Sequence, residues 1–329
     1  MDKILDVSIV KLTNYRTVWG YIHKKKSVTI PQISKAIGLS LPTVTRAVEY
    51  GIKEGIIESV GISSPERGRK AQVYSLRADY MHFILIYIDS EKLRFVVHDF
   101  LSRDIKHGEV PVNNDNVLRI LEEVSVSLCE SDVLISMISI AFSGVMHKGT
   151  VIDSAAYRSL NGVNLINAVG KRTGKLVLAD NDLHITALAA PTYKGHIKDE
   201  TTLLFAFGKT ASGIGITICD YVIHGAGGAA GETGNIPTLS EDVAEKRTEF
   251  CAERLQAAIA LLNPKRVIMY ELDGTVLSSD IEAVLAKNLK PYILPEFVKG
   301  RDFSKDCFIG LSLACEKEIK RNLKERLDL

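Results

Sequence analysis

Hydrophobic positions near the start of the chain follow the period of an α-helix. Tyr15, Val18, Trp19 and Ile22 fall on one helical face, which predicts a first helix over Val10–Lys24. From residue 81 onward, short apolar runs of strand length alternate with amphipathic helical segments. The chain is therefore expected to join a small helical N-terminal domain to a larger α/β body.

A second helix is predicted to begin after Thr29. Pro31 and Gln32 follow at the positions of a capping box. Apolar residues then recur at helical spacing: Ile30, Ile33, Ala36 and Ile37. Gly38 suits the left-handed conformation that ends many helices. A short helix followed by a tight turn is expected.

A third helix is predicted to start at Ser40, with Pro42 in its first turn, and to end near Gly55. Its core face should consist of Val44, Ala47, Val48 and Ile52. Such a pair over Thr29–Ile57 is typical of a helix-turn-helix, whose second helix reaches base edges in the DNA major groove. Two helices of an ordinary small bundle would give the same pattern.

The outward side of this third helix offers groups that can contact bases. Hydroxyls and a guanidinium are suitable hydrogen-bond partners for base edges, and threonine methyl groups can contact thymine. Leu41 also faces outward. The candidate DNA-binding residues of this helix are Ser40, Thr43, Thr45 and Arg46.

Two alternating segments, Ile56–Val60 and Gln72–Leu76, predict a β-hairpin after the third helix. The loop between them, Gly61–Ala71, is rich in basic residues. Its Arg69 and Lys70 are candidates for contacts to the DNA backbone or minor groove, as in a wing. A flexible charged linker is the alternative interpretation.

Charge separates the two parts of the chain. Residues 1–78 contain 13 Lys and Arg against 6 Asp and Glu, a net charge of +7, whereas the remainder contains 28 against 34, a net charge of −6. A basic N-terminal domain on an acidic body favours phosphate contact by one end only. The charge therefore favours the DNA-binding interpretation over the bundle.

The body shows the same order of segments twice. Strands are expected over 83–88, 93–98, 104–112, 133–141, 176–179, 203–207, 215–219, 221–224 and 266–270, and helices over 116–129, 165–173, 183–193, 241–262, 278–287 and 308–322. Two rounds of hairpins followed by helix-strand alternation predict two similar α/β lobes with mixed sheets. The expected domains are residues 1–78, 79–198 and 199–329, with the last helix returning to the first lobe.

Candidate ligand groups follow the predicted strands, where α/β folds bind ligands. Asp180, Asn181 and Asp182 form an acceptor cluster between a strand and a helix. Capping of that helix by Asn181 or Asp182 is the alternative. Dense glycines between Gly208 and Asn235 suggest close backbone approach to a ligand. A phosphate-binding P-loop is rejected there, because its upstream glycine is missing.

Several classes of protein are excluded. The first residues lack the pattern of a signal peptide, and the longest apolar stretch, Val133–Met146, is too short to span a bilayer. The five cysteines are scattered without a C-x-x-C pair, so neither a disulfide framework nor a zinc ribbon is expected. A cytoplasmic location is predicted.

Together these segments resemble the ROK family (repressors, open reading frames, kinases) in its branch of transcription regulators. The marks lie in the family's order along nearly the whole chain: Ser40–Arg46, Gly55–Ile57, Gly68-Arg69, Asp89, Asn181-Asp182, Thr210–Gly215, Gly225–Gly234 and Ile309–Ala314. The resemblance implies an α/β chain with an N-terminal winged helix-turn-helix followed by a two-lobed actin-like ATPase (ribonuclease-H-like) domain.

The resemblance also implies a sugar site. Asp182 matches the base that activates the sugar hydroxyl in family kinases, and Glu232 matches a sugar contact. Asn235 stands where the family has a histidine that serves the sugar site and zinc, and the cysteine-rich zinc loop is missing. The expected ligand-binding set is Asn181, Asp182, Glu232 and Asn235, with no metal and no cofactor.

The phosphate-binding turns depart from the family pattern. Asp89 is followed by Ser90-Glu91-Lys92 instead of a glycine turn, which brings a carboxylate near the place of the ATP phosphates. Two glycines of the family's second turn are altered in Lys209–Gly213. Because phosphoryl transfer depends on positioning ATP, no kinase activity is expected, and Asp182 is a vestigial base.

The predicted function is a repressor of carbohydrate-use genes. It is expected to bind a double-stranded DNA operator as a homodimer or higher homo-oligomer, to sense a sugar or sugar phosphate, and to have no membrane partner. A ROK-type sugar kinase with a DNA-binding domain is the alternative from another class. A regulator that only dimerises, without a ligand, is the third possibility.

Overall fold

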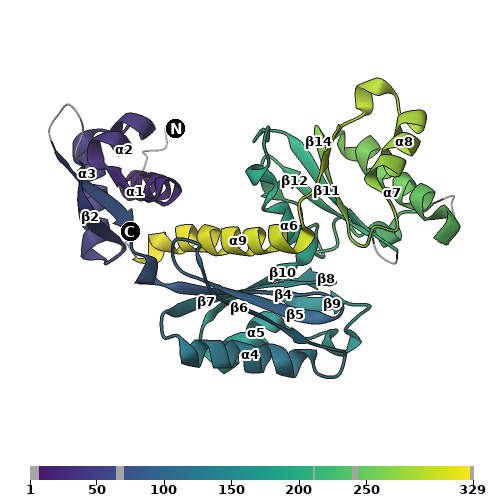
Figure 1. Cartoon of the computed structure of the whole chain (residues 1–329), viewed down its shortest axis with the longest axis horizontal. Coiled ribbons are helices and arrows are strands. Elements are labelled where there is room, and N and C mark those ends of the chain that lie inside the picture. Colours follow the sequence, from purple (N-terminus) through teal and green to yellow (C-terminus); the bar gives the residue numbers. More distant parts are fainter. Residues whose placement is uncertain (1–6, 64–69, 210–211, 239–243, 327–329) are drawn as a thin grey trace, which may run out of the picture.

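The N-terminal domain combines helices with a small antiparallel sheet (Figure 1). The computed structural model describes residues 7–63, 70–209, 212–238 and 244–326. The N-terminal elements are α1 (Val7–Lys25), β1 (Val28–Thr29), α2 (Ile30–Ile37), α3 (Leu41–Lys53), β2 (Ile57–Ser63) and β3 (Ala71–Leu76). Strand order β1-β3-β2 confirms the predicted hairpin and adds β1, which was not predicted.

The helix ends predicted in this domain are confirmed. The Thr29 amide donates to Gln32 Oε1 at 2.8 Å, and the Gln32 amide donates to Thr29 Oγ1 at 3.4 Å, which completes the capping box. Gly38 is left-handed, with φ 70°, after the end of α2. The Thr43 amide donates to Ser40 Oγ at 3.4 Å at the start of α3. The turn between α2 and α3 is therefore specified by local interactions.

The core of the N-terminal domain joins α1 to α3. Trp19 Nε1 donates to the Ala47 carbonyl at 3.0 Å. Ile52, predicted to lie in this core, is 44% exposed, whereas Gly51 is buried against Ile57. With about 3.6 residues per turn, the buried face returns at Gly51, and Ile52 lies one position beyond it. The prediction for Ile52 was wrong for this reason.

The first lobe is built on a mixed sheet. Its strands are β4 (His82–Ile88), β5 (Lys92–His98), β6 (Asp104–Pro111), β7 (Ile135–Phe142) and β10 (Leu176–Asn181). The order is β10-β7-β4-β5-β6, in which β4, β5 and β6 are antiparallel while β7 and β10 run parallel to β4. One face is covered by α4 (Val117–Ser131) and α5 (Leu165–Thr173) (Figure 1). A separate hairpin joins β8 (Val145–His147) to β9 (Thr150–Asp153).

The second lobe repeats this topology. Its strands are β11 (Thr201–Phe207), β12 (Ser212–Ile218), β13 (Tyr221–Val222), β14 (Arg266–Glu271) and β15 (Glu296–Lys299), in the order β13-β12-β11-β14-β15. Three antiparallel strands are again followed by two parallel ones. The lobe's helices are α7 (Arg247–Leu262) and α8 (Ser278–Asn288). Two similar α/β lobes with mixed sheets are confirmed.

A predicted helix over 183–193 is shorter in the structure. It is α6 (Asp182–Ala187), and a 3-10 turn occupies Ala190–Thr192. Pro191 lacks an N–H and disfavours the helical conformation of the residue before it, which explains the early end. Other 3-10 turns occupy Ala78–Tyr80, Arg158–Leu160, Thr233–Asn235, Ala244–Lys246 and Pro291–Ile293.

Two further boundaries differ from the predictions. The helix expected over 241–262 is described from Arg247, and residues 239–243 lie outside the described ranges. The strands β8, β9 and β15 were not predicted, because each has four residues or fewer and little alternating pattern. Among the described helices, none combines the length and hydrophobicity that a bilayer crossing requires.

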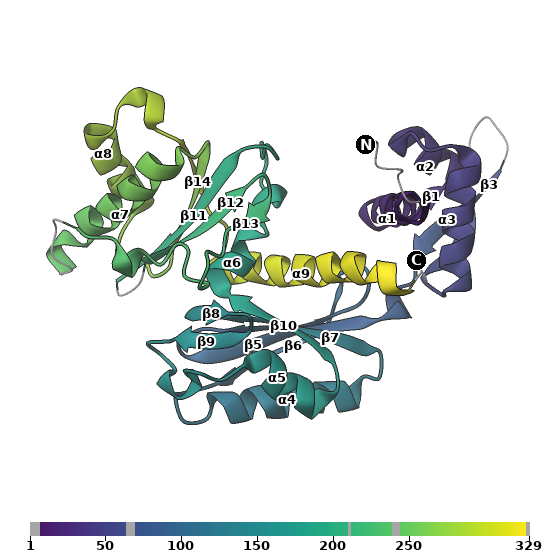
Figure 2. The same ribbon diagram turned by 180° about the vertical axis from the view of Figure 1, so that it is seen from behind.

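The last helix, α9 (Phe303–Arg326), connects all parts of the molecule. It begins five residues before the predicted Phe308, starts beside the second lobe, crosses the face of the first sheet opposite α4, and extends toward α1 (Figures 1 and 2). Leu311 and Cys315 pack on Phe83 and Met137 of that sheet. The domain boundaries expected at residues 78 and 198 stay predictions.

Candidate functional site

The start of α3 presents the predicted DNA-contacting side chains. Leu41 is 51% exposed and Arg46 is exposed, whereas Thr43 and Thr45 are half-buried. Ser40 Oγ and Thr43 Oγ1 lie 2.8 Å apart, and Thr45 Oγ1 donates to the Leu41 carbonyl at 2.9 Å. These hydroxyl groups stabilise the helix start. Arg46 has the most freedom to reach a base, and Thr45 retains an acceptor oxygen and a methyl group.

The hairpin tip is described only in part. Lys70 precedes β3 and is exposed. Arg69 lies outside the described residues, so its predicted role stays a prediction. Ser63 Oγ accepts from the Ala71 amide at 3.2 Å, which closes the base of the wing. Lys70 therefore lies next to a backbone position, Ala71, that is held by a hydrogen bond at the edge of the small sheet.

The cluster at the end of β10 holds two of the predicted ligand residues. Asn181 Oδ1 accepts from the amides of Leu183 and His184 at 2.8 and 3.2 Å, and Asn181 Nδ2 donates to the Gly144 carbonyl at 2.8 Å. Asn181 therefore caps α6, which was the alternative interpretation. Its side chain positions Asp182, the first residue of that helix.

Glu232 acts electrostatically on Asp182. Burial, with a smaller contribution from nearby Glu232, raises the pKa of Asp182 to about 7 against the hydrogen bonds from Leu183 and Ser143. Burial also raises the pKa of Glu232. Asn235 lies at the end of a 3-10 turn and is exposed. The structure thus brings two carboxyl groups of the predicted set together.

The glycine-rich segment serves internal packing at two positions. A Cβ on Gly228, which has φ 78°, would lie 1.9 Å from the Met146 carbonyl oxygen. A Cβ on Gly231, which has φ 87°, would lie 1.7 Å from the Ile214 carbonyl oxygen. These glycines let backbone approach backbone. The expectation of ligand approach is therefore wrong for Gly228 and Gly231.

Carboxylates accept backbone hydrogen bonds in both turns that the family resemblance predicts to be phosphate-binding. Asp89 Oδ1 accepts from the amides of Glu91 and Lys92 at 2.9 and 2.8 Å, and Asp89 Oδ2 pairs with Arg94. In the second lobe, Asp273 Oδ2 accepts from the Lys209 amide at 2.6 Å. Amide groups that could bind phosphate therefore bind the protein's own carboxylates.

A second polar cluster lies beside the predicted set. His184 Nδ1 is 3.1 Å from Asp180 Oδ1, and His224 Nε2 is 2.7 Å from Asp180 Oδ2. The hydrogen bonds from the two histidines hold the pKa of Asp180 at about 2 despite burial, and Asp180 raises the pKa of His224. All three line a cavity of about 620 Å³ that also reaches Lys317 on α9.

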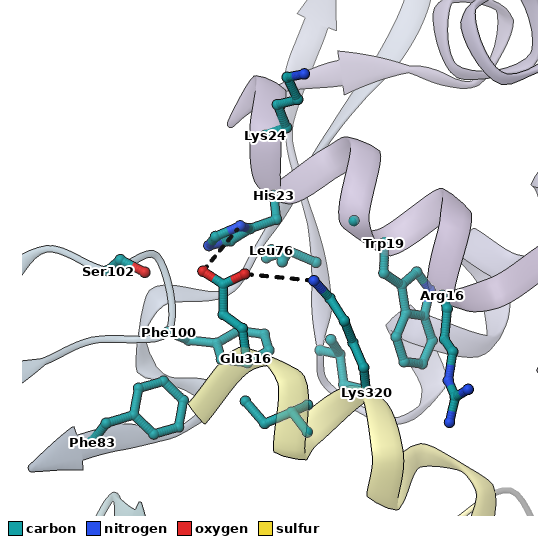
Figure 3. A pocket seen from close by; sticks show the side chains of 13 residues that line it. Arg16, Trp19, His23, Lys24, Leu76, Phe83, Phe100, Ser102, Glu316 and Lys320 are labelled. Atoms are coloured by element: carbon teal, nitrogen blue, oxygen red, sulfur yellow. Dashed lines mark ion pairs between the residues drawn. The ribbon is translucent and has the colours of Figure 1, made fainter. Parts of the chain in front are cut away.

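A smaller cavity of about 220 Å³ lies where the N-terminal domain meets the body (Figure 3). Glu316 on α9 lies between His23 and Lys320, with His23 Nδ1 at 3.9 Å and Lys320 Nζ at 3.6 Å from its oxygens. Lys26 Nζ donates to the Leu101 carbonyl at 2.8 Å. The N-terminal domain is therefore attached to the body by polar contacts around α1 and α9.

Residues 113–261 match the model of the ROK family. A candidate xylose repressor of Caldicellulosiruptor sp. strain Rt8B.4 is 26% identical over 267 residues, which cover 78% of this chain and 66% of that protein. A ROK family transcriptional regulator, a homologue of the E. coli MLC protein, has a similar structure with a TM-score of 0.72 at 18% identity, covering 96% of this chain and 97% of its own. These similarities fit a ROK family regulator.

The similar proteins include some that are named as repressors and some that are named as kinases. The xylose repressor of Bacillus subtilis strain 168 is 20% identical over 242 residues, which cover 71% of this chain and 62% of that protein. The matched part thus spans slightly less than two thirds of both curated relatives. The ROK hexokinase of Thermus thermophilus has a TM-score of 0.57 at 16% identity and covers 73% of this chain and 100% of its own. The predicted fold class is confirmed.

No strong pattern in the sequence pointed to His184 and His224 as site residues. The i, i+4 spacing of Asp180 and His184 was the available signal, because it places both side chains on one side of a strand–helix junction. His224 lies 40 residues further along the chain, on the other lobe, and no local pattern connects it to Asp180.

Proposed function

We propose that this ROK protein is a sequence-specific DNA-binding repressor of sugar-use genes, with the two-lobed body as its sugar sensor. The observation that carries the proposal is a capped helix with exposed Leu41 and Arg46 on a domain with a net charge of +7. The xylose repressors among its relatives support a carbohydrate-linked role.

The DNA-binding surface is assigned to the front of α3 and to the wing. Arg46 would contact a base edge, because its guanidinium is exposed and is not needed to cap the helix. Thr45 would contact DNA mainly through its methyl group and acceptor oxygen, since its hydroxyl donates to the Leu41 carbonyl. Ser40 and Thr43 share one hydrogen bond, in which only one hydroxyl donates, so the other hydroxyl can donate to DNA. Arg69 and Lys70 would contact phosphates.

The effector site is assigned to Asp182, Glu232 and Asn235, with Asn181 as a positioning residue. Carboxyl and amide groups suit the hydroxyls of a sugar, and xylose is the first candidate because of the relatives' names. Binding regulates DNA affinity only if the sugar has different affinities for two arrangements of the lobes. A dimer that binds two half-sites about one helical turn apart would respond to such a change.

A sugar kinase is the second candidate, and the match of Asp182 to the kinase base favours it. The altered turns oppose it, because Ser90-Glu91-Lys92 replaces the family's glycine turn after Asp89, and the Asp273 carboxylate accepts from the Lys209 amide of the second turn. ATP would meet negative charge at both places. We therefore assign no kinase activity to this chain.

Selection of genomic fragments by the purified full chain tests the proposed function. We expect enrichment of a defined palindromic site, a change in its affinity when xylose or another sugar is added, and loss of enrichment in Arg46→Ala. A sugar that shifts the melting temperature but leaves DNA binding unchanged would contradict the sensor role. Failure to enrich any sequence would contradict the whole proposal.

A further inference from the structure

Three potential metal ligands from both lobes converge on one point. Asp180 ends β10 and His184 lies on α6, next to the first lobe, whereas His224 follows β13 of the second lobe. One ligand atom from each, a carboxylate oxygen and two imidazole nitrogens, lie within 4.8 Å of one another. The His184 and His224 rings are 4.6 Å apart between centroids and meet edge to face.

Both ring nitrogens of His184 face acceptor oxygens, an arrangement that suits a second ring proton or a bound metal cation. Its Nδ1 faces Asp180 Oδ1 at 3.1 Å, and its Nε2 faces the Ala230 carbonyl oxygen at 3.3 Å. A neutral imidazole carries one N–H, so it can donate to only one of these two acceptors. If Nε2 donates to Ala230, the lone pair of Nδ1 points toward a carboxylate, and a metal ion near both atoms satisfies them.

Metal-binding histidines commonly have a hydrogen-bond partner on the ring nitrogen that does not bind the metal. A ligating imidazole usually donates its second N–H to a backbone carbonyl or a carboxylate, which fixes the ring and the free nitrogen. The Ala230 carbonyl is in the right place to do this for His184. His184 is 2% exposed and is thereby held rigidly, whereas the side chain of His224 is 49% exposed and leaves a path for the ion to enter.

We propose that Asp180, His184 and His224 bind a divalent transition-metal cation of the zinc type, which joins the two lobes. Two imidazoles and one carboxylate are ligands that suit zinc, cobalt or nickel better than magnesium or calcium. A tetrahedral ion with bonds of about 2.0–2.1 Å separates its ligand atoms by about 3.3 Å. One ligand atom from each residue already lies within 4.8 Å of the others. His184 Nδ1 and His224 Nε2 face different oxygens of Asp180, so a small rotation of the carboxylate would bring one oxygen to the ion.

The proposed site differs from the zinc loop implied by the family resemblance. That loop needs cysteines and a histidine at the position of Asn235, and the sequence provides neither. The proposed site also leaves a fourth coordination position for water, beside the cavity of about 620 Å³. It does not depend on the proposed repressor function. It differs from the expectation of no metal made from the sequence. That expectation rested on local patterns, whereas the three ligands come from separated parts of the chain.

Zinc titration of the untagged, chelator-stripped full chain tests the proposal. Calorimetry should show one saturable zinc site per chain in the wild type and in the control His107→Ala, whose histidine is exposed on β6. His224→Ala and Asp180→Asn should bind zinc at least about 100-fold more weakly, because even outer-shell losses cost about 10- to 100-fold. Cobalt should give tetrahedral visible absorption only in the wild type and the control.

Thermal melting distinguishes a variant that has lost a metal-binding side chain from a variant that has lost its folded structure. Without metal, His224→Ala should melt only slightly below the wild type, since Asp180 loses one hydrogen-bond partner but keeps His184, and the His224 side chain is half-exposed. Added zinc should raise the melting temperature of the wild type and the control but not of the variants. No saturable site in the wild type, or wild-type affinity in both His224→Ala and Asp180→Asn, would overturn the proposal. If Asp180→Asn does not fold, His224→Ala decides.

Discussion

At the scale of single residues, Arg46 should decide sequence preference. Arg46→Ala should weaken binding to the selected operator by about 1–3 kcal/mol and relax the preference at one base pair, because a bidentate base contact is lost. Competition binding against operators with single base changes measures both effects. The control Arg119→Ala, on α4 with an exposed Glu123 pair, should bind like the wild type. Unchanged affinity and preference in Arg46→Ala would remove Arg46 from the DNA-contacting set.

Lys70 should act on every DNA sequence alike. A lysine at the edge of the wing meets phosphate, so Lys70→Ala should weaken operator and random DNA equally and lower the salt slope of binding by about 1. Binding measured across a range of salt concentrations tests this. Lys106→Ala, exposed on β6, is the matched control. A loss restricted to the operator would instead indicate a base contact by Lys70.

At the scale of elements, Gly310 is where α9 meets α6. A Cβ at Gly310 would lie 1.9 Å from the Ile185 carbonyl oxygen, and backbone cannot move aside like a side chain. Gly310→Ala should therefore destabilise the protein by about 1–3 kcal/mol, measured by urea unfolding. Gly20→Ala is the matched control on α1, since nothing lies within 4 Å of its Cβ and alanine favours a helix by up to about 1 kcal/mol. Equal stability of the two variants would contradict the close contact.

Elements were predictable where their ends are specified locally. The boundaries of α2 and α3 follow from caps at Thr29 and Ser40 and from Gly38, all within a few residues of the groups they satisfy. The short strands β1 and β15 were missed because they exist through pairing with β3 and β14, which lie far along the chain. Strands of this kind depend on their partners more than on their own pattern.

At the scale of the whole molecule, we expect a kinase-like body that does not transfer phosphate. Purified protein should show no sugar-dependent ATP turnover with xylose, hexoses or N-acetylhexosamines, because Glu91 places a carboxylate in the first predicted phosphate-binding turn and Asp273 binds the Lys209 amide of the second. A coupled assay for ADP measures this, with a ROK sugar kinase as positive control. Sugar-dependent turnover that disappears in Asp182→Asn would establish the kinase alternative.

The arrangement of α9 suggests how the parts communicate. Its start packs near α6, which begins at Asp182, and its end reaches α1 through Glu316 and the contact of Arg16 with the Arg321 carbonyl at 3.3 Å. A shift of the lobes around the ligand site would therefore move the helix that holds the DNA-binding domain (Figures 1 and 3). Allosteric coupling requires a structural element that moves when the protein changes between two arrangements, and α9 is placed to be this element.

The sequence by itself determined the helix caps, the hairpin, the charge difference and the order of ROK segments. These depend on neighbouring residues or on composition, so a linear pattern contains them. Tertiary structure alone decided that Gly228 and Gly231 serve packing and that Asp180, His184 and His224 meet. Each of these depends on groups brought together from distant parts of the chain, and their contacts form only when the lobes fold and pack.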